Sequence, residues 1–323
     1  MIKIITHGDL DGLTSASIIY DILLRKQERI IVHIAQPFNL YTLLRNTTLE
    51  NSIKEVYILD IGLDETTWEK TYQELKILRE KNVKIHWIDH HVATLNHLNQ
   101  IIDLEIELLF SLKGSTVTII GKNFLNKTSE PRFYKKLLIM GEVGDKIRKI
   151  NENHPLTKYI EYIGSSLVAN PSDDQFKINI IKLWVKQKNL VNDEILQRYE
   201  KAFSKLKELT KYSKNCIIFE NEKIIIIDLR NTRVHGYVGK IASYYTSKKN
   251  KIVFILFKAN PFETIITCRV PPSKKFDASK ILPQIAKKYG GGGGGHRKAA
   301  SIRIPREMTE RFIDELKNLF IPR

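Results

Sequence analysis

The chain has 323 residues, of which 42% are hydrophobic, and this is enough for two domains that each bury a core. No apolar run is as long as a membrane span, and the start of the sequence lacks the architecture of a signal peptide, so we expect a cytoplasmic protein with no membrane partner. The formal net charge of +16 predicts attraction to polyanions, with a merely lysine-rich surface as the alternative.

The first ninety residues alternate short apolar runs with helical patterns. Strands are expected at 3–6, 30–35, 56–59 and 83–88, and helices after residue 12 and over 65–80. Strands that alternate with helices indicate βαβ units and a parallel sheet. The sequence therefore predicts an α/β fold for this part of the chain.

Polar side chains that can bind metals follow three of these strands: His7, Asp9 and Asp11, then Asp60, then Asp89, His90 and His91. In open α/β sheets, ligands bind at the carboxyl ends of the strands, so these residues are expected to share one edge. Oxygen and imidazole ligands without thiolates favour manganese or magnesium, with zinc as an alternative. For the run at 87–91 taken alone, a polar turn after a strand is the alternative.

Two helices are expected at 115–125 and 132–140, and Asp145 follows the second. Gly144 could turn the chain so that Asp145 reaches the same edge, although a lone Asp after a helix is more often a surface cap. Helical patterns continue over 156–185, with a break near 170–171, and over 195–209. We interpret the last of these as a helix that connects two domains.

A second, smaller α/β pattern fills the rest of the chain. It predicts a hairpin at 216–219 and 224–227, strands at 252–257, 264–270 and 301–304, and helices at 236–246, 278–289 and 309–320. Six glycines, 290–295, precede His296 and lie between a helix and a strand. They are expected to form either a backbone nest for a phosphate or a flexible linker.

Cys216 and Cys268 both fall in apolar, strand-like runs. We therefore expect two buried thiols in a reducing compartment, and a zinc cluster built on cysteine is excluded.

These motifs together resemble the DHH phosphoesterase family, which includes RecJ-type exonucleases and nanoRNases. Residues 7–12 (His-Gly-Asp-Leu-Asp-Gly) resemble the first motif, Asp60 the second, 89–91 the third and Asp145 the fourth. Residues 291–301 resemble the glycine-rich GGGH-x-x-AAG signature of the DHH-associated C-terminal domain. Ser301 departs from this signature, because the family usually has glycine there.

The resemblance implies a centre with two divalent ions, manganese preferred and magnesium as the alternative. His7, Asp9 and Asp60 would hold one ion, and Asp11, Asp60, His90 and Asp145 would hold the second, with Asp60 as the bridge. His91 would face the scissile phosphate, and Asp89 would orient the neighbouring histidines.

The resemblance also implies that catalysis and substrate binding belong to different domains. Residues 1–185 would form the catalytic domain, 186–213 the connecting helix and 214–323 the substrate-binding domain, with the active site in the cleft between the two domains. The substrate would be held by Arg269, Gly292, Gly293, Gly294, Gly295, His296 and Arg297. A solvated strand-end charge is the alternative for Arg269, and Arg230, Arg233, His235 and Lys240 are expected to add to a basic wall.

The expected activity is that of an archaeal-type, RecJ-like 5′→3′ exonuclease on single-stranded DNA, with RNA as a second substrate and a repair or replication partner such as a helicase. The alternative is a nanoRNase, or a phosphatase for cyclic dinucleotides or 3′-phosphoadenosine phosphate. Hydrolysis of pyrophosphate is disfavoured, because the pyrophosphatases of the family lack the C-terminal signature that this sequence has. A scaffold that has lost catalysis is disfavoured because every expected ligand is present.

Overall fold

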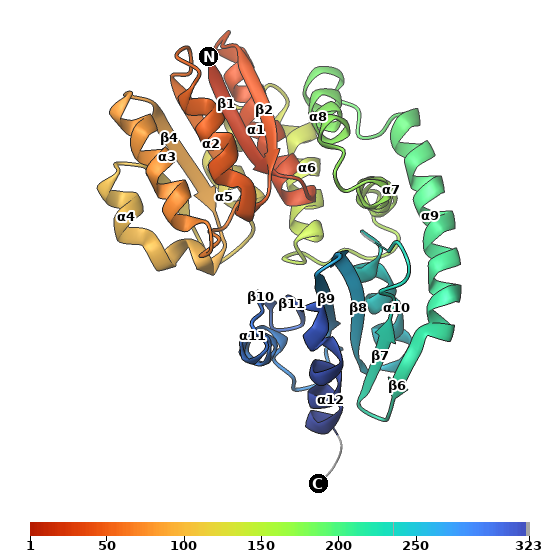
Figure 1. Cartoon of the computed structure of the whole chain (residues 1–323). Helices are drawn as coiled ribbons and strands as arrows, with labels where there is room; N and C mark the ends of the chain where they lie inside the picture. Colours follow the sequence, from red (N-terminus) through yellow and green to blue (C-terminus); the bar gives the residue numbers. More distant parts are fainter. Residues whose placement is uncertain (235, 321–323) are drawn as a thin grey trace. The chain divides into compact units, whose positions relative to one another are not determined.

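The computed structural model describes residues 1–234 and 236–320 (Figure 1). The chain divides into two compact units, which we call the N-terminal unit (Met1–Tyr199) and the C-terminal unit (Glu200–Arg323). None of the helices in the described part of the chain combines the length and the apolarity that crossing a bilayer requires.

The N-terminal unit is built on a parallel sheet of five strands in the order β2-β1-β3-β4-β5. The strands are β1 (Ile2–His7), β2 (Ile30–Ala35), β3 (Glu55–Leu59), β4 (Lys84–Asp89) and β5 (Glu107–Phe110). The predicted parallel α/β sheet is confirmed. Strand β5 was not predicted, because it is a four-residue edge strand in which no side chain is fully buried.

Helices pack on both faces of this sheet. One face meets α1 (Leu10–Arg25), α5 (Thr116–Phe124), α6 (Pro131–Gly144), α7 (Thr157–Ala169) and α8 (Asp174–Lys182). The other face meets α2 (Leu40–Thr48), α3 (Trp68–Glu80) and α4 (Leu98–Asp103). Each face therefore has its own hydrophobic core, and the sheet lies between two helical layers.

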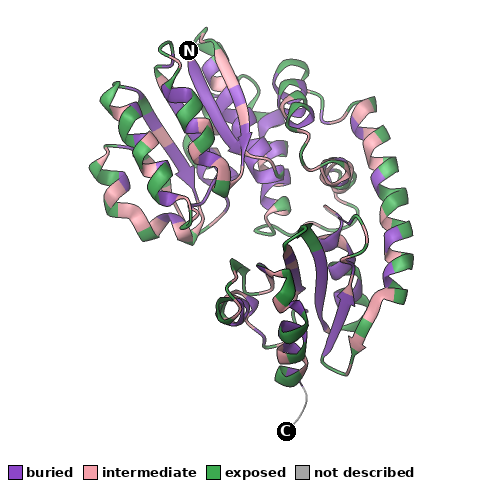
Figure 2. Ribbon diagram, viewed as in Figure 1, coloured by how far each residue is buried: buried purple, intermediate pink, exposed green. Residues whose placement is uncertain are grey.

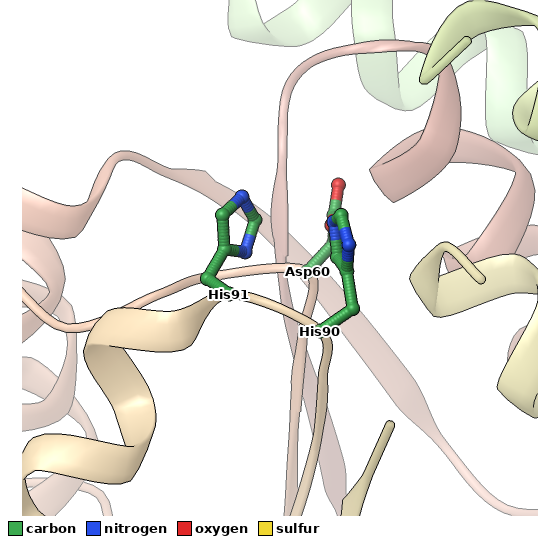
Figure 3. Close-up of side chains that lie close together, drawn as sticks. All are labelled: Asp60, His90 and His91. Carbon is green, nitrogen blue, oxygen red and sulfur yellow. The ribbon is translucent and has the colours of Figure 1, made fainter. Parts of the chain in front are cut away.

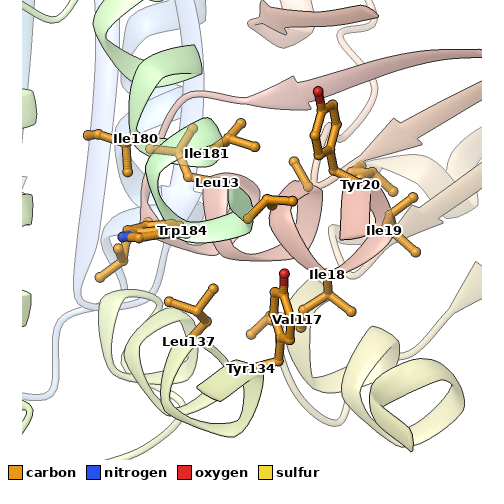
Figure 4. Packing of buried hydrophobic residues seen from close by; sticks show 14 of the residues in the cluster. Leu13, Ile18, Ile19, Tyr20, Val117, Tyr134, Leu137, Ile180, Ile181 and Trp184 are labelled. Atoms are coloured by element: carbon orange, nitrogen blue, oxygen red, sulfur yellow. The ribbon is translucent and has the colours of Figure 1, made fainter. Parts of the chain in front are cut away.

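Helix α1 is almost completely enclosed (Figures 2 and 4). Its sequence from Gly12 to Ser17 is mostly small residues, so α5 and α6 pack closely against it. Leu13 and Ile18 contribute to the core that α1 shares with Tyr134 and Trp184. Because this helix carries Asp11 in its first turn, its packing holds that carboxylate in place.

The C-terminal unit contains a mixed sheet of six strands in the order β10-β11-β9-β8-β7-β6. They are β6 (Ile217–Glu220), β7 (Ile224–Asp228), β8 (Ile252–Asn260), β9 (Glu263–Arg269), β10 (Gly292–His296) and β11 (Ala299–Pro305). Only β7 and β8 pair in parallel among the described strands of this sheet. Its helices are α10 (Val238–Lys249), α11 (Ala278–Lys288) and α12 (Thr309–Phe320), and α9 (Asp193–Ser213) includes the boundary between the units.

Most of the glycine run forms a strand and is therefore not a flexible linker. Gly292 to His296 form strand β10, which pairs antiparallel with β11 at the edge of the sheet. The strand was not predicted, because glycines at 293 and 295, with φ of 146° and 143°, adopt an extended form that other residues avoid. Strand propensity therefore gave no signal for this segment.

The two cysteines differ in burial. Cys268 is buried in β9, as expected, and burial raises the pKa of its thiol. Cys216 is only half-buried, so the expectation of two buried thiols is correct for one of them.

Candidate metal centre

Three neighbouring strands of the N-terminal unit end in side chains that can bind metals. Strands β1, β3 and β4 are adjacent in the sheet, and His7, Asp60 and Asp89 stand at or directly after their carboxyl ends. Ligand atoms come together in three groups: His7, Asp9 and Asp60; Asp60, His90 and His91; and Asp11, His90 and Asp145. The structure thus gathers all the predicted ligands of the N-terminal unit at one edge of the sheet.

His7 and Asp9 form one side of this cluster. His7 Nδ1 lies 3.0 Å from Asp9 Oδ2 and 3.9 Å from Asp60 Oδ2, and His7 Nε2 lies 3.1 Å from the side-chain oxygen of Gln36. When Nε2 donates its proton to Gln36, the lone pair of Nδ1 faces the two carboxylates, as in a histidine that binds a metal. Without a metal, burial opposes protonation of His7, but the charge of Asp9 and its hydrogen bond raise the pKa to about 9.

Asp11 is held by the start of a helix. Its carboxylate accepts hydrogen bonds from the backbone N–H groups of Thr116 (2.8 Å) and Val117 (2.9 Å) in the first turn of α5. The positive end of that helix favours a negative charge at this position. Burial and the nearby charge of Asp9 nevertheless raise the pKa of Asp11 to about 7.

Asp60 lies in the middle of the cluster. Its Oδ1 is 3.4 Å from His90 Nε2 (Figure 3) and accepts a 2.9 Å hydrogen bond from Thr116 Oγ1. Its Oδ2 faces His7. Its backbone is left-handed, with φ of 59°, a conformation that Asp and Asn tolerate better than most residues. Burial, followed by the charges of Asp11, Asp9 and Asp89, raises the pKa of Asp60 well above its ordinary value.

Asp89 and His91 form a hydrogen-bonded pair beside the cluster. Asp89 is fully buried, and its two oxygens accept from His91 Nδ1 at 2.7 Å and Thr94 Oγ1 at 2.5 Å. Burial opposes protonation of His91, but the hydrogen bond with Asp89 raises its pKa. A ring nitrogen of His91 also lies within 4.8 Å of ligand atoms of Asp60 and His90.

Asp145 reaches the cluster from the end of α6. Its Oδ2 lies 3.6 Å from His90 Nε2, so it is not the surface cap that a lone Asp after a helix suggests. The predicted turn at Gly144 is wrong, because α6 continues through that residue. A side chain at Gly144 would collide with Leu10, and the left-handed turn occurs instead at Lys146.

Glycines allow the motifs to approach one another. A Cβ atom at Gly12 would lie 2.3 Å from the backbone oxygen of His7, and one at Gly62 would lie 2.7 Å from His91 Cβ. Any side chain at these positions would push the ligand-bearing segments apart. The Gly12 of the first motif is thus required by packing between α1 and the end of β1.

Several carboxylates crowd this small volume: Asp9, Asp11, Asp60, Asp89 and Asp145. The raised pKa values of Asp11 and Asp60 result from burial and mutual repulsion. Divalent cations would relieve that repulsion, and a set of oxygen and imidazole donors fits Mn²⁺ or Mg²⁺. The residues present therefore fit a divalent metal centre.

Three supporting residues could not be found from the sequence: Gln36, Thr94 and Thr116. Thr94 is five residues from Asp89, whereas Thr116 is 56 residues from Asp60. A Ser or Thr before an apolar helix signals a helix start, but this signal does not reveal which side chain the hydroxyl contacts. Only the fold shows these partners.

Replacing Thr116 with Val is expected to lower the turnover number about tenfold, because it removes the donor that orients Asp60 without changing the volume of the side chain. Metal titration should show weaker affinity in the same variant. The matched control is Thr47→Val, which removes a buried hydroxyl that donates to the backbone oxygen of Leu43 in α2. Equal rates and equal metal affinities in the two variants would show that Thr116 does not support the centre.

The predicted substrate-binding residues all lie in the C-terminal unit; Arg269, His296 and Arg297 come together at one end of β10, and Gly292 lies at its other end. Ala299 of β11 pairs with both His296 of β10 and Arg269 of β9, and Arg297 lies in the turn between β10 and β11. Burial lowers the pKa of Arg269, and its Nε finds no hydrogen-bond acceptor among the described residues. A buried donor without a partner favours anion binding over a solvated charge at this position.

The additional basic wall is only partly supported. Arg230 pairs with Asp228 and Glu310, so acidic neighbours compensate its charge. Arg233 is exposed, whereas His235 lies outside the described residues.

Comparisons with known proteins agree with this geometry. A model described as the DHH family, N-terminal domain, matches residues 1–142, and a model described as the DHHA1 domain matches residues 221–321. A sequence search of curated proteins found no match.

Solved structures with similar folds cover almost the whole chain. A DHH domain described as a member of a family of ribosomal proteins is 17% identical with a TM-score of 0.73, covering 98% of this chain and 86% of that one. A pGpG-specific phosphodiesterase, PggH from Vibrio cholerae, is 14% identical with a TM-score of 0.59, covering 98% and 97%. RecJ from Thermus thermophilus, in complex with Mn²⁺, is 16% identical with a TM-score of 0.62, covering 99% of this chain and 52% of that one. With its strand-end motifs, its mixed C-terminal sheet and both domain matches, this chain belongs to the DHH family of phosphoesterases and carries the DHH-associated C-terminal domain.

Proposed function

We propose that the protein is a Mn²⁺-dependent exonuclease that removes nucleotides from the 5′ end of single-stranded nucleic acid, with DNA preferred over RNA. The observation that carries the proposal is the position of Asp60 between two groups of ligands. One oxygen faces His7, and the other faces His90. A carboxylate placed in this way suits a bridge between two ions.

Each ion would have its own set of ligands from this chain. His7, Asp9 and Asp60 would hold the first, and Asp11, Asp60, His90 and Asp145 would hold the second. When bound, the two ions would supply an activated water and neutralise charge on the leaving oxygen of a phosphodiester. The anionic cluster would thus carry out hydrolysis, and substrate binding would involve other residues.

His91 would act on the substrate phosphate. Asp89 accepts the hydrogen bond of Nδ1 and raises the pKa of the ring, which favours the form in which Nε2 also carries a proton. This N–H would donate to an oxygen of the scissile phosphate and stabilise its growing negative charge. Asp89, which is buried and also held by Thr94, would keep the ring in that orientation.

The distribution of charge supports a polymeric substrate. Residues 1–199 hold 26 Lys and Arg and 25 Asp and Glu, whereas residues 200–323 hold 26 and 11. Almost the whole net charge therefore belongs to the C-terminal unit. A strand with many phosphates gains from such a surface, while a dinucleotide needs only a small basic pocket.

Under this proposal, the substrate bound by the C-terminal unit is the one that the metal centre cleaves. Arg269 and His296 would hold a phosphate or base of the strand, next to the glycine strand β10. Residues 1–185, 186–213 and 214–323 would then act as catalytic domain, connecting helix and substrate-binding domain.

A second candidate is a phosphodiesterase for very short oligonucleotides. It is favoured by the fold similarity to the pGpG-specific enzyme, because that match covers nearly all of both chains. The two functions differ in the substrate length that they require.

The test uses DNA and RNA strands of several lengths, labelled at either end and incubated with Mn²⁺. The proposal predicts that long single strands are degraded to mononucleotides, that a phosphorothioate block at the 5′ end stops digestion and that a blunt duplex resists. A duplex resists because unstacking costs a few kcal/mol per step. Digestion stopped only by a 3′ block would refute the polarity, and cleavage of dinucleotides to tetranucleotides alone would establish the second candidate.

A further inference from the structure

Part of one face of the C-terminal sheet carries polar and small side chains. Along β11, Ala300, Ile302 and Ile304 are buried, whereas Ser301 and Arg303 are exposed. The buried side chains pack in a core with residues of α11 and α12. Because side chains alternate along a strand, Ser301 and Arg303 point to the opposite face.

The strand register places further residues on the face of Arg303. Gly292 pairs with Arg303, Gly294 with Ser301, and Ala299 with both His296 and Arg269. Directly paired residues share a face of a sheet, and so do residues two apart on one strand. Arg269 and His296 therefore lie at one end of this face, and Arg303 lies at the other.

Strand β10 contributes only one side chain, that of His296, to this face, because the other two positions are Gly292 and Gly294. Side chains at Gly293 and Gly295 would collide with the backbone of β11, so packing explains those two glycines. A Cβ at Gly292 or Gly294 would meet nothing within 4 Å, so packing does not explain these two. A strand that lacks side chains where space is open is typical of a place where a ligand approaches the backbone closely.

Arg303 is available to a ligand. Its side chain is 57% exposed, and the carboxylate of Glu263, which also accepts from Asn260, lies 3.8 Å from its Nε. An exposed ion pair of that length contributes little. A phosphate could therefore displace it and form the bidentate contact that a guanidinium favours.

We propose that Arg303 forms a second phosphate subsite on this face, separate from the one at Arg269 and His296. The inference rests on the proposed function, because it takes those two residues as the first subsite. Arg303 is four residue steps along the strand from Ala299, which corresponds to about 13 Å at about 3.3 Å per residue. Neighbouring phosphates of one strand lie closer together than that, so a dinucleotide at the first subsite does not reach Arg303.

Ser301 lies between the two subsites on the same face. Its hydroxyl is 2.8 Å from Thr267 Oγ1, which belongs to the next strand, β9. The serine that stands where the family usually has glycine thus adds a hydrogen-bonding group to the path of the strand. The face as a whole selects strands longer than two nucleotides.

The test compares Arg303→Gln with Arg311→Gln, which removes the same charge from an exposed position of α12. Binding of a labelled oligothymidylate of about twelve nucleotides is measured in EDTA by fluorescence anisotropy at several salt concentrations. Arg303→Gln is expected to weaken binding about tenfold and to lower the log–log salt slope by about 0.7, and Arg311→Gln to change neither. Hydrolysis of the dinucleotide pTpT with Mn²⁺ should be equal in all three proteins.

Unchanged oligothymidylate binding in Arg303→Gln would overturn the subsite. A decrease in the rate of pTpT hydrolysis as large as the decrease in oligothymidylate affinity would overturn it as well. If the wild-type protein cleaved no phosphodiester, the proposed function would fail, while the binding comparison would still decide the role of Arg303. The two failures are therefore distinguishable.

Discussion

Replacing Asp60 with Asn is expected to lower the turnover number at least about a hundredfold and to leave the affinity for single strands within about twofold. The large loss follows because Asp60 faces both groups of ligands, so one substitution weakens both ion sites. Affinity should persist because the proposed strand binding would depend on Lys and Arg side chains, whose excess over acidic residues lies almost entirely in the C-terminal unit. The measurements are steady-state kinetics with Mn²⁺ and strand binding in EDTA.

Asn is the informative substitution at this position. The backbone of Asp60 is left-handed, and Asn tolerates that conformation, whereas Ala would add strain to the loss of the carboxylate. Asn also keeps an oxygen for the hydrogen bond from Thr116. The control is Asp103→Asn, the same change at an exposed position of α4. A variant that kept more than about a tenth of the wild-type rate would show that Asp60 is not the bridging ligand.

Removing divalent metal should abolish hydrolysis. The cluster offers oxygen and imidazole donors, and the carboxylates that raise each other's pKa repel one another until cations are bound. After metal stripping, activity in excess EDTA is expected to be undetectable, with full recovery on addition of Mn²⁺ and weaker recovery with Mg²⁺. Full hydrolysis in EDTA would refute a metal-dependent mechanism.

The same cations should stabilise the fold. Binding to the folded state alone raises the unfolding temperature as the metal concentration rises. A thermal scan should therefore show a Mn²⁺-dependent increase for the wild-type protein and a much smaller one for Asp60→Asn. Equal increases in both proteins would place the stabilising ion elsewhere.

The sequence predicts the position of the candidate metal centre well because parallel strands impose a simple geometry. Three apolar runs end in Asp or His, and strands that lie side by side must bring those ends to one edge. Asp145 was harder to place, because its position depends on how far α6 extends and not on a flexible Gly144. The resemblance of Asp145 to the fourth DHH motif indicated a role as a metal ligand, which the position of this residue after a helix did not indicate.

The features that could not be predicted from the sequence mostly depend on contacts between distant segments. Thr116 approaches Asp60 because α5 packs against α1, and no local pattern encodes that contact. The glycine strand escaped prediction because its conformation is stabilised by pairing with β11 and not by the propensity of its residues. Short edge strands such as β5 carry too little periodicity to be recognised.

The two-ion centre is tested most directly by anomalous diffraction from crystals of the protein grown with Mn²⁺. A two-ion centre bridged by Asp60 would give two peaks about 3.5–4 Å apart, one between His7 and Asp9 and one among Asp11, His90 and Asp145, with Asp60 contacting both. A single peak, or two peaks with Asp60 bound to only one of them, in protein that hydrolyses single strands at full rate would contradict it.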